Sequence, residues 1–414
     1  MVTPKLRFKE FGGDWAKVSL DKISKVFDGT HQTPNYVESG IKFVSVENIH
    51  APYESDKFIT KEAFNKDFKN KPQLNDILMT RITAGEIGAT AIVDDREPLA
   101  YYVSLALIRP TTKVTTPFLN QYIGTPFFKN ELHKRIIHVA FPKKINLGDI
   151  NECLVSLPDK HEEQNKIASF LSVVDEKISQ LTQKHQLLSQ YKQGMMQKLF
   201  SQQIRFKSDD GSEFGEWEHK ALSNFIIKHK GGASLTPSDF VEHSEYEVIP
   251  KKAIVPNGYL NLDKDNPTYC SDLFFKANLK NTVDNSYLIT VLRDLVPSGP
   301  SIGYIVKFLE DNQYILAQGV YGFKLAEELN KDYLIHFSNT KTYRLVMQSI
   351  MVGSTQVHIR NQDFFGIEIP APCLEEQTKI AHFLSAIDQK IEKVAQQVKE
   401  TKQWKKGLLQ QMFV

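Results

Sequence analysis

The chain has 414 residues, of which 41% are hydrophobic and 24% are charged, and it carries 26 phenylalanines and 15 tyrosines. This length exceeds one ordinary hydrophobic core and predicts at least two domains, and the aromatic content excludes a disordered chain. The 51 lysines and arginines nearly balance the 49 aspartates and glutamates, so the net charge of +2 does not by itself indicate nucleic-acid binding.

Targeting and metal signals are missing from the sequence. The opening MVTPKLRFKE has no apolar run, and no stretch approaches the roughly 20 apolar residues that a membrane span needs. Cys153, Cys270 and Cys373 are far apart, and no CxxC or Cys/His metal spacing occurs. We therefore expect a cytoplasmic location, no membrane contact and no metal on this chain.

Residues 1–157 are expected to form a first globular domain with mixed helices and strands. The segments GATAIVDD and YYVSLALIRP are rich in β-branched and aromatic residues, which favours strands. One helix is predicted over residues 117–136. The overlapping stretch 129–144 holds five lysines and arginines against one glutamate, so it is a solvated face or a phosphate-binding surface.

A long helix is predicted over residues 158–201. Between residues 167 and 199, the positions spaced alternately four and three residues apart are all apolar except His185 and Lys192. This is the pattern of a heptad seam. About 40 helical residues span roughly 60 Å. The seam residues that we assign are Ile167, Leu171, Val174, Ile178, Leu181 and Leu188.

A second globular domain, residues 202–370, and a second long helix, residues 371–414, follow. The segment SYLITVLRD predicts strand, and one helix is expected over residues 332–350. The second seam runs from 380 to 412 with Thr401 and Lys405 as its polar exceptions. Its assigned residues are Ile380, Leu384, Ile387, Ile391, Val394 and Val398.

The second half of the chain repeats the first. EEQNKIASFLSVVDEKI at 162–178 and EEQTKIAHFLSAIDQKI at 375–391 are identical at twelve of seventeen positions. Gly29 and the pair Thr33-Pro34 find counterparts, in the same order, in Gly232 and the pair Thr236-Pro237. The order is thus globular part, helix, globular part, helix, which indicates an internal duplication.

Each long apolar seam must be buried against another protein surface. Packing of each helix on its own globular part is one interpretation, but a helix of roughly 60 Å exceeds a domain of about 150 residues, with a radius of gyration near 15 Å. The matching seam of the other copy is the better partner. We therefore predict an α+β protein: two mixed α/β domains related by a pseudo-twofold axis and joined by two long helices in an antiparallel coiled coil.

No catalytic motif stands out. Phosphate-binding glycine loops and the HExxH metal motif are absent from the sequence. Pro158-Asp159 followed by Asp175 and Lys177 resembles a nuclease carboxylate–lysine set, but Asp175 and Lys177 fall on the heptad helix and Ala371 replaces Asp159 in the second copy. Helix capping and solvated helix charges explain these residues better, so no catalytic residue is assigned.

The segments LPDKHEEQNKIASFL and IPAPCLEEQTKIAHFL, which precede and open the two helices, resemble the conserved regions of the DNA-specificity subunits of Type I restriction–modification enzymes. The resemblance covers essentially the whole chain. It implies a non-catalytic subunit with two target-recognition domains, each reading half of a bipartite double-stranded DNA site. It also implies two methyltransferase subunits and motor-nuclease subunits as partners, which would carry S-adenosylmethionine, ATP and magnesium.

Candidate DNA contacts follow from that resemblance, because polar loop residues read base edges whereas lysines and arginines bind phosphates. The base-edge candidates are His31, Gln32, Arg81, His138, Arg293, Gln356 and His358. The phosphate candidates are Lys129, Lys134, Arg135, Lys143 and Lys144 in the first domain and Lys228, Lys230, Lys251, Lys252 and Arg360 in the second. Two other functions stay open, a self-sufficient DNA nuclease and a coiled-coil adaptor that binds only proteins.

Overall fold

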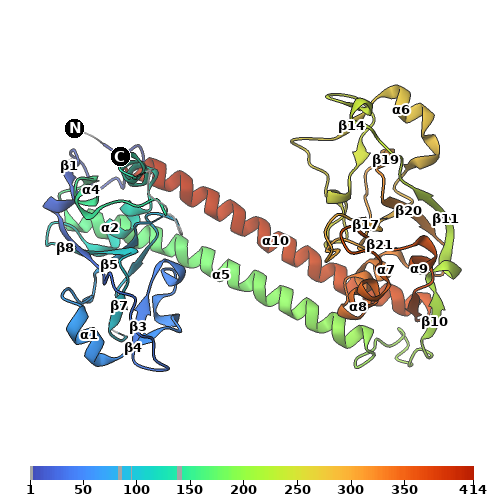
Figure 1. Cartoon of the computed structure of the whole chain (residues 1–414), viewed down its shortest axis with the longest axis horizontal. Helices are drawn as coiled ribbons and strands as arrows, with labels where there is room; N and C mark the ends of the chain where they lie inside the picture. Colours follow the sequence, from blue (N-terminus) through green and yellow to red (C-terminus); the bar gives the residue numbers. More distant parts are fainter. Residues whose placement is uncertain (1–2, 83–85, 95, 138–141) are drawn as a thin grey trace. The chain divides into compact units, whose positions relative to one another are not determined.

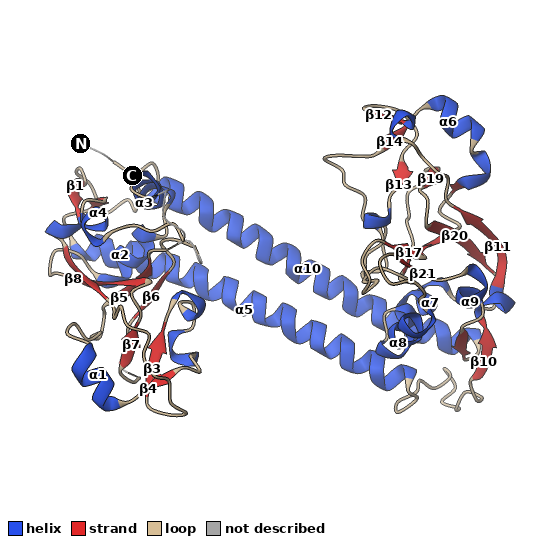
Figure 2. Cartoon of the chain, viewed as in Figure 1, coloured by secondary structure: helices blue, strands red, loops and turns tan. Residues whose placement is uncertain are grey.

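The computed structural model describes residues 3–82, 86–94, 96–137 and 142–414. The chain divides into two compact units. The first unit comprises Met1–Gln183 and Ala395–Val414, and the second comprises Lys184–Val394. Each unit therefore contains one globular head, the first part of one long helix and the last part of the other long helix. Helices and strands mix in both heads (Figure 2).

The two long helices are α5 (His161–Phe200) and α10 (Leu374–Met412), each drawn as an unbroken ribbon in Figure 1. Both begin with glutamates in the first turn, which favour the positive end of the helix dipole. In the part of the chain that the structure describes, no helix is both long enough and apolar enough to cross a membrane.

The first head is built on a four-stranded antiparallel sheet in the order β2-β8-β5-β6. A three-stranded sheet, β4-β3-β7, contains one parallel pair, and β1 pairs with β9 just before α5. The strands are β1 (Ala16–Ser19), β2 (Ser24–Asp28), β3 (Ile41–Val44), β4 (Phe58–Ile59), β5 (Ile77–Thr80), β6 (Thr90–Ile92), β7 (Leu99–Tyr101), β8 (Leu105–Pro110) and β9 (Leu154–Leu157). The helices are α1 (Lys61–Asp67), α2 (Thr116–Ile123), α3 (Pro126–Lys134) and α4 (Leu147–Asn151).

The second head repeats this plan, with β11-β20-β16-β18 as its four-stranded sheet, β13-β19-β15 as its three-stranded sheet and β10-β22 as the ribbon before α10. Two further ribbons are β12-β14 and β17-β21. The strands are β10 (Glu218–Ala221), β11 (Ile226–Gly231), β12 (Phe240–Val241), β13 (Val248–Ile249), β14 (Tyr269–Cys270), β15 (Thr282–Val283), β16 (Leu288–Val291), β17 (Arg293–Asp294), β18 (Ile305–Val306), β19 (Tyr314–Leu316), β20 (Val320–Leu325), β21 (Val357–His358) and β22 (Glu368–Ala371). The helices are α6 (Asp272–Ala277), α7 (Lys331–Ser338), α8 (Lys341–Ile350) and α9 (Asn361–Phe365).

The repeated glycines hold equivalent places in the two heads. A Cβ on Gly29 would lie 2.6 Å from the carbonyl oxygen of Tyr102, and one on Gly232 would lie 1.8 Å from that of Ala317. Both glycines follow the edge strand of the larger sheet and precede a parallel bridge to the smaller one. Only glycine allows the two backbones to approach this closely, which explains why both copies keep it.

The single helix expected over residues 117–136 is wrong, as is the one over residues 332–350. The structure breaks the first into α2 and α3 and the second into α7 and α8. Thr125 caps α3 by accepting a hydrogen bond from the Phe128 amide (3.2 Å), and Pro126 cannot donate to a continuing helix. Thr340 caps α8 in the same way, from the Tyr343 amide.

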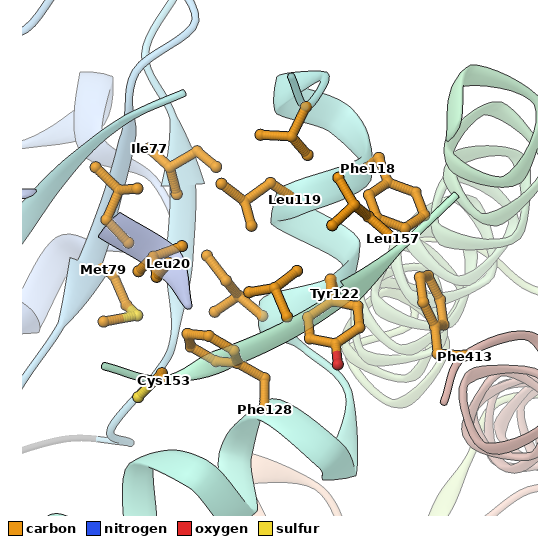
Figure 3. Packing of buried hydrophobic residues seen from close by; sticks show 14 of the residues in the cluster. Leu20, Ile77, Met79, Phe118, Leu119, Tyr122, Phe128, Cys153, Leu157 and Phe413 are labelled. Atoms are coloured by element: carbon orange, nitrogen blue, oxygen red, sulfur yellow. The ribbon is translucent and has the colours of Figure 1, made fainter. Parts of the chain in front are cut away.

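The core of the first head incorporates the last residues of the chain. Phe413 lies 5.5 Å from the Phe118 ring and 5.6 Å from the Tyr122 ring, between α2 and the end of α10 (Figure 3). In the second head, Phe200 at the end of α5 lies 5.3 Å from Tyr333 of α7. Each head is thus closed by the end of the long helix that begins in the other unit.

Candidate nucleic-acid interface and helix junctions

The glutamate of the repeated EEQ motif anchors each long helix to its head. Glu376 is 0% exposed and accepts hydrogen bonds from Arg205 Nε (3.0 Å), Arg205 Nη2 (2.7 Å) and Trp217 Nε1 (3.0 Å). Glu163, 2% exposed, is held by Arg7 at 2.7 and 2.8 Å. Such two-point arginine–carboxylate pairs fix geometry as well as adding energy. The motif therefore serves the junction between head and helix.

The glutamine of the motif completes each junction. Gln164 accepts a hydrogen bond from the Thr115 amide (2.8 Å) and donates to the carbonyls of Lys113 (3.2 Å) and Pro158 (3.0 Å). Gln377 makes the same contacts in the second unit, to the Asn330 amide and to two carbonyls before α7 and α10. Our sequence reasoning assigned no role to these residues, although their identity in both copies was the available signal.

The seam residues of both helices face inward. All twelve assigned seam residues are buried or half-buried, and in each unit the ends of α5 and α10 share one hydrophobic core. The two lysines that interrupt the seams form ion pairs across the helices. Lys405 Nζ lies 2.5 Å from Asp175 in the first unit, and Lys192 Nζ lies 2.6 Å from Asp388 in the second. These pairs have the same chemistry in both units.

The nuclease-like set is not assembled. Asp175 is occupied by Lys405 and by the Gln121 side-chain amide at 3.0 Å, whereas Lys177 is exposed. Among the described residues, no group of three or more His, Cys, Asp or Glu side chains has a geometry that could hold a metal ion. The contacts of Asp175 are those of a helix-pairing residue.

His336 of α7 is buried beside the Lys192–Asp388 pair and should make the second unit sensitive to acid. Burial, followed by the nearby Lys192, lowers the pKa of His336 to about 3. Its Nε2 lies 3.1 Å from Ser385 Oγ, and its Nδ1 lies 3.8 Å from Asp388. Below a pH of about 6.5 the unfolded chain takes up a proton that the folded chain does not, so stability falls by up to about 1.4 kcal/mol per pH unit until the pH nears the folded pKa.

We expect His336→Gln to remove this acid sensitivity. Between about pH 7.5 and about pH 5.5, the free energy of unfolding of the second unit should fall by about 1.4 kcal/mol more in the unmodified protein than in this variant. Urea unfolding at the two pH values measures the difference, and His219→Gln, on an exposed strand position, is the control. Equal losses in all three proteins would contradict a buried neutral histidine.

The base-edge candidates of the first head are placed differently from one another. His31 and Gln32 are exposed after β2, and His31 Nε2 lies 2.8 Å from Asp28. Arg81 is 8% exposed and donates to Asp28 (2.7 Å) and to two main-chain carbonyls, so its guanidinium is used within the fold. His138 lies outside the described residues.

The phosphate candidates of the first head are partly paired. Lys129 bonds Glu86, and Glu131 accepts from Lys134 and Arg135, each at 2.9 Å. The side chains of Lys129 and Lys134 are 34% and 59% exposed, and partly exposed ion pairs of this kind cost little to exchange for phosphate contacts. Lys143 and Lys144 are exposed on the loop before α4.

The candidates of the second head gather more closely. Arg293 of β17 lies directly opposite His358 of β21, and Gln356 is exposed one residue before β21. Arg293 and His358 line a cavity of about 300 Å³. Lys251, beside this cavity, has its pKa lowered by burial and by Arg293. Folding therefore brings these sequence-predicted residues of the second head close together.

The remaining cations of the second head divide by position. Lys228 and Lys252 are exposed, and Arg360 is exposed at the start of α9. Lys230 instead donates to the carbonyl of Thr282 and lies 5.3 Å from the Tyr287 ring, and burial lowers its pKa. Lys230 thus supports the fold more than it offers a free charge.

Known proteins place this architecture in one family. Residues 12–190 and 215–401 match the family described as the Type I restriction modification DNA specificity domain. These ranges cover most of the chain, which therefore belongs to the Type I restriction–modification DNA specificity family. The resemblance that the two helix motifs indicate is confirmed, and so are the mixed α/β architecture and its internal repeat.

Individual relatives agree with this assignment. The type I restriction enzyme specificity subunit MjaX of Methanocaldococcus jannaschii is 28% identical, over 98% of this chain and 94% of that protein. The MjaVIII specificity subunit of the same organism is 29% identical over 60% of this chain and 58% of its own length. The fold resembles the solved S subunit of a Type-I restriction-modification system from M. genitalium, with a TM-score of 0.62 at 14% identity over 100% of this chain and 99% of that one.

Proposed function

We propose that this chain is a non-catalytic DNA sequence-specificity subunit in which each head reads one half of a bipartite double-stranded DNA site. The observation that carries the proposal is the duplicated junction, in which Arg7–Glu163 and Arg205–Glu376 fasten two heads to two like helices. The two heads share this framework but present different exposed cations, which suits two different half-sites. Family membership supports the DNA-recognition role.

The proposal includes an antiparallel coiled coil of α5 and α10 that sets the spacer between the half-sites. The Asp175–Lys405 and Lys192–Asp388 pairs support it, because advancing seventeen residues along α5 corresponds to going back seventeen residues along α10. This is the constant register of an antiparallel pair. A helix of 40 residues extends for roughly 60 Å, enough to serve half-sites about one DNA turn, roughly 34 Å, apart.

Partner subunits would supply the chemistry. We propose that two methyltransferase subunits dock along the helices, with motor-nuclease subunits completing the assembly, and that S-adenosylmethionine, ATP and magnesium bind to those partners. The exposed apolar side chains Val173, Leu187, Tyr191 and Trp404 on the helices are surfaces that such partners would cover. The complex would act in the cytoplasm.

Exchange of one head tests the proposal. Residues 1–157 are replaced by the first head of another specificity subunit, and the chain is co-expressed with methyltransferase subunits in cells whose DNA is then sequenced for methylation. We expect one half-site of the methylated motif to change while the other half-site and the spacer stay the same, because each head has its own core.

Three outcomes would contradict the proposal. A change in both half-sites would show that the heads do not read independently. DNA binding that is absent, or insensitive to salt when a slope near −0.9 per phosphate contact is expected, would favour the protein-only adaptor. DNA cleavage by the purified chain that Asp175→Asn abolishes would favour the nuclease.

A further inference from the structure

Arginine pairing separates structural from available guanidinium groups. The chain has nine arginines, all within the described residues. Seven have side-chain hydrogen bonds, ion pairs or ring contacts, as with Arg109 on Asp76 or Arg344 on the Ile302 carbonyl. Arg293 and Arg360 have no such side-chain contact with any described residue, and both are exposed in the second head. The guanidinium groups of Arg293 and Arg360 are therefore available for a contact outside the chain.

The two free arginines flank one short ribbon. Arg293 of β17 pairs with His358 of β21, and Arg360 follows two residues later. Ile359 between them is 3% exposed, so alternation along an extended chain points His358 and Arg360 away from the core. The nearest carboxylate along the chain, Asp294, is occupied by the Ser301 hydroxyl at 2.9 Å. Asp294 still carries a negative charge that acts on Lys251, but Arg293 and Arg360 form no ion pair with any described residue, so the ribbon and its end carry two exposed guanidinium groups.

Main chain forms much of the wall beside this ribbon. A Cβ on Gly319 would lie 2.8 Å from Lys251 Cε and 3.1 Å from Arg293 Cβ. Gly231, Gly232 and Ser234 line the same cavity as Arg293 and His358. The close packing at Gly319 places Lys251 and Arg293 side by side at this cavity, and two such cations suit an electron-rich edge.

Equivalent backbone hydrogen bonds identify the matching position in the first head. The Arg81 amide donates to the Ser104 carbonyl (3.0 Å), as the Leu292 amide does to that of Gly319 (3.1 Å). The Arg81 carbonyl accepts from the Ile145 amide (3.0 Å), as that of Leu292 does from the Ile359 amide (2.9 Å). The buried Arg81 is thus the counterpart of the buried Leu292.

The counterpart of Arg293 is consequently the next residue, Ile82, which is half-buried. Ile82 bridges Lys144, just as Arg293 pairs with His358. One cross-strand pair of the duplicated framework is therefore isoleucine and lysine in the first head, and arginine and histidine in the second head. A framework position that keeps its backbone and changes its side-chain chemistry is what two different half-sites require.

We infer that this cross-strand pair is a base-reading position in each head, with Arg293 reading a guanine in the second half-site and Ile82 with Lys144 reading a different base in the first. The inference rests on the proposed function. A guanidinium donates two parallel hydrogen bonds to guanine O6 and N7, whereas an aliphatic side chain favours the thymine methyl group. Arg360 and Lys251 contact the flanking phosphates.

Substitution of Arg293 tests the inference. Arg293→Ala and Arg293→Gln chains, with co-expressed methyltransferase subunits, are examined by sequencing the methylated motif and by fluorescence anisotropy on duplexes with each base at every position of the second half-site. We expect one guanine preference in that half-site to weaken by roughly 5- to 150-fold in both variants, with the first half-site unchanged. Arg360→Ala should instead weaken binding to all sequences alike and reduce the salt slope by about 1.

A reciprocal variant tests the equivalence of the two heads. Ile82→Arg combined with Lys144→His should change the base preferred at one position of the first half-site only. Lys276→Ala, in an exposed ion pair of α6, is the control expected to keep the original motif. Thermal unfolding of every variant shows that a lost preference is not lost folding.

The outcomes separate the inference from the proposed function. A bipartite motif that Arg293→Ala and Arg293→Gln leave unchanged at every base would overturn the inference while leaving the proposed function intact. Uniform weakening on all duplexes would make Arg293 a phosphate contact and would also overturn it. A chain that directs no sequence-specific binding or methylation, before any substitution, would overturn the proposed function itself.

Discussion

Arg205→Ala should lower the free energy of unfolding of the second unit by about 3–5 kcal/mol. The change removes the partner of Glu376, which is 0% exposed and would retain only its hydrogen bond from Trp217. A buried carboxylate left without its cation costs this much because burial removes it from water without compensation. Urea unfolding followed by circular dichroism measures the loss.

Two variants control for the position and the chemistry of that change. Lys276→Ala removes an exposed ion pair with Asp272 and should cost no more than about 1 kcal/mol. Arg7→Ala should destabilise the first unit through Glu163, leaving the second unit near its original stability. A loss after Arg205→Ala no larger than that after Lys276→Ala would contradict the anchoring role of the motif glutamate.

A heptad inserted into both long helices should lengthen the DNA spacer of the site. The insertions follow Gln183 in α5 and Gln396 in α10, which lie at matching points between the two cross-helix ion pairs. Seven residues add about 10 Å of helix, close to three base pairs, and keep the apolar seam in phase. Sequencing of methylated DNA from cells that carry the variant and its partner subunits reads the new spacer directly.

Insertion into α5 alone is the matched control for that experiment. The seam stays apolar, but Asp175–Lys405 and Lys192–Asp388 can no longer both form, because one helix is a heptad longer between them. We expect this variant to lose stability and sequence-specific methylation. An unchanged spacer with full activity after the double insertion would contradict the helices as a spacer.

The long helices were predictable because their signal is local. A heptad seam repeats along one element, and both seams are buried or half-buried along the lengths that the sequence indicated. The break between α2 and α3 was missed although Thr125 and Pro126 are strong local signals, since the apolar run on either side resembles one helix. Periodicity alone did not show where a capping residue interrupts it.

The candidate DNA contacts show the opposite limit. Arg81 and Arg293 are alike in sequence, each following an apolar strand, and both were predicted at base edges. Folding places Arg81 against Asp28 inside the first head and leaves Arg293 exposed in the second. A shift of one residue along a strand reverses the face to which a side chain points. No local sequence pattern indicates to which of the two faces a given side chain points.

The duplication, the family, the two long helices and the apolar seams were predictable from the amino-acid sequence, because each is a pattern of spacing or identity along the chain. Three-dimensional contacts were needed to show that Glu163 and Glu376 anchor the helices, that Lys192 and Lys405 pair with carboxylates across the seam, and that Arg293 forms no ion pair with the described residues. These roles depend on residues brought together from distant parts of the chain. At such contacts, burial and charge pairing distinguish an arginine that is used within the fold from one that stays exposed, and no single segment of the sequence encodes them.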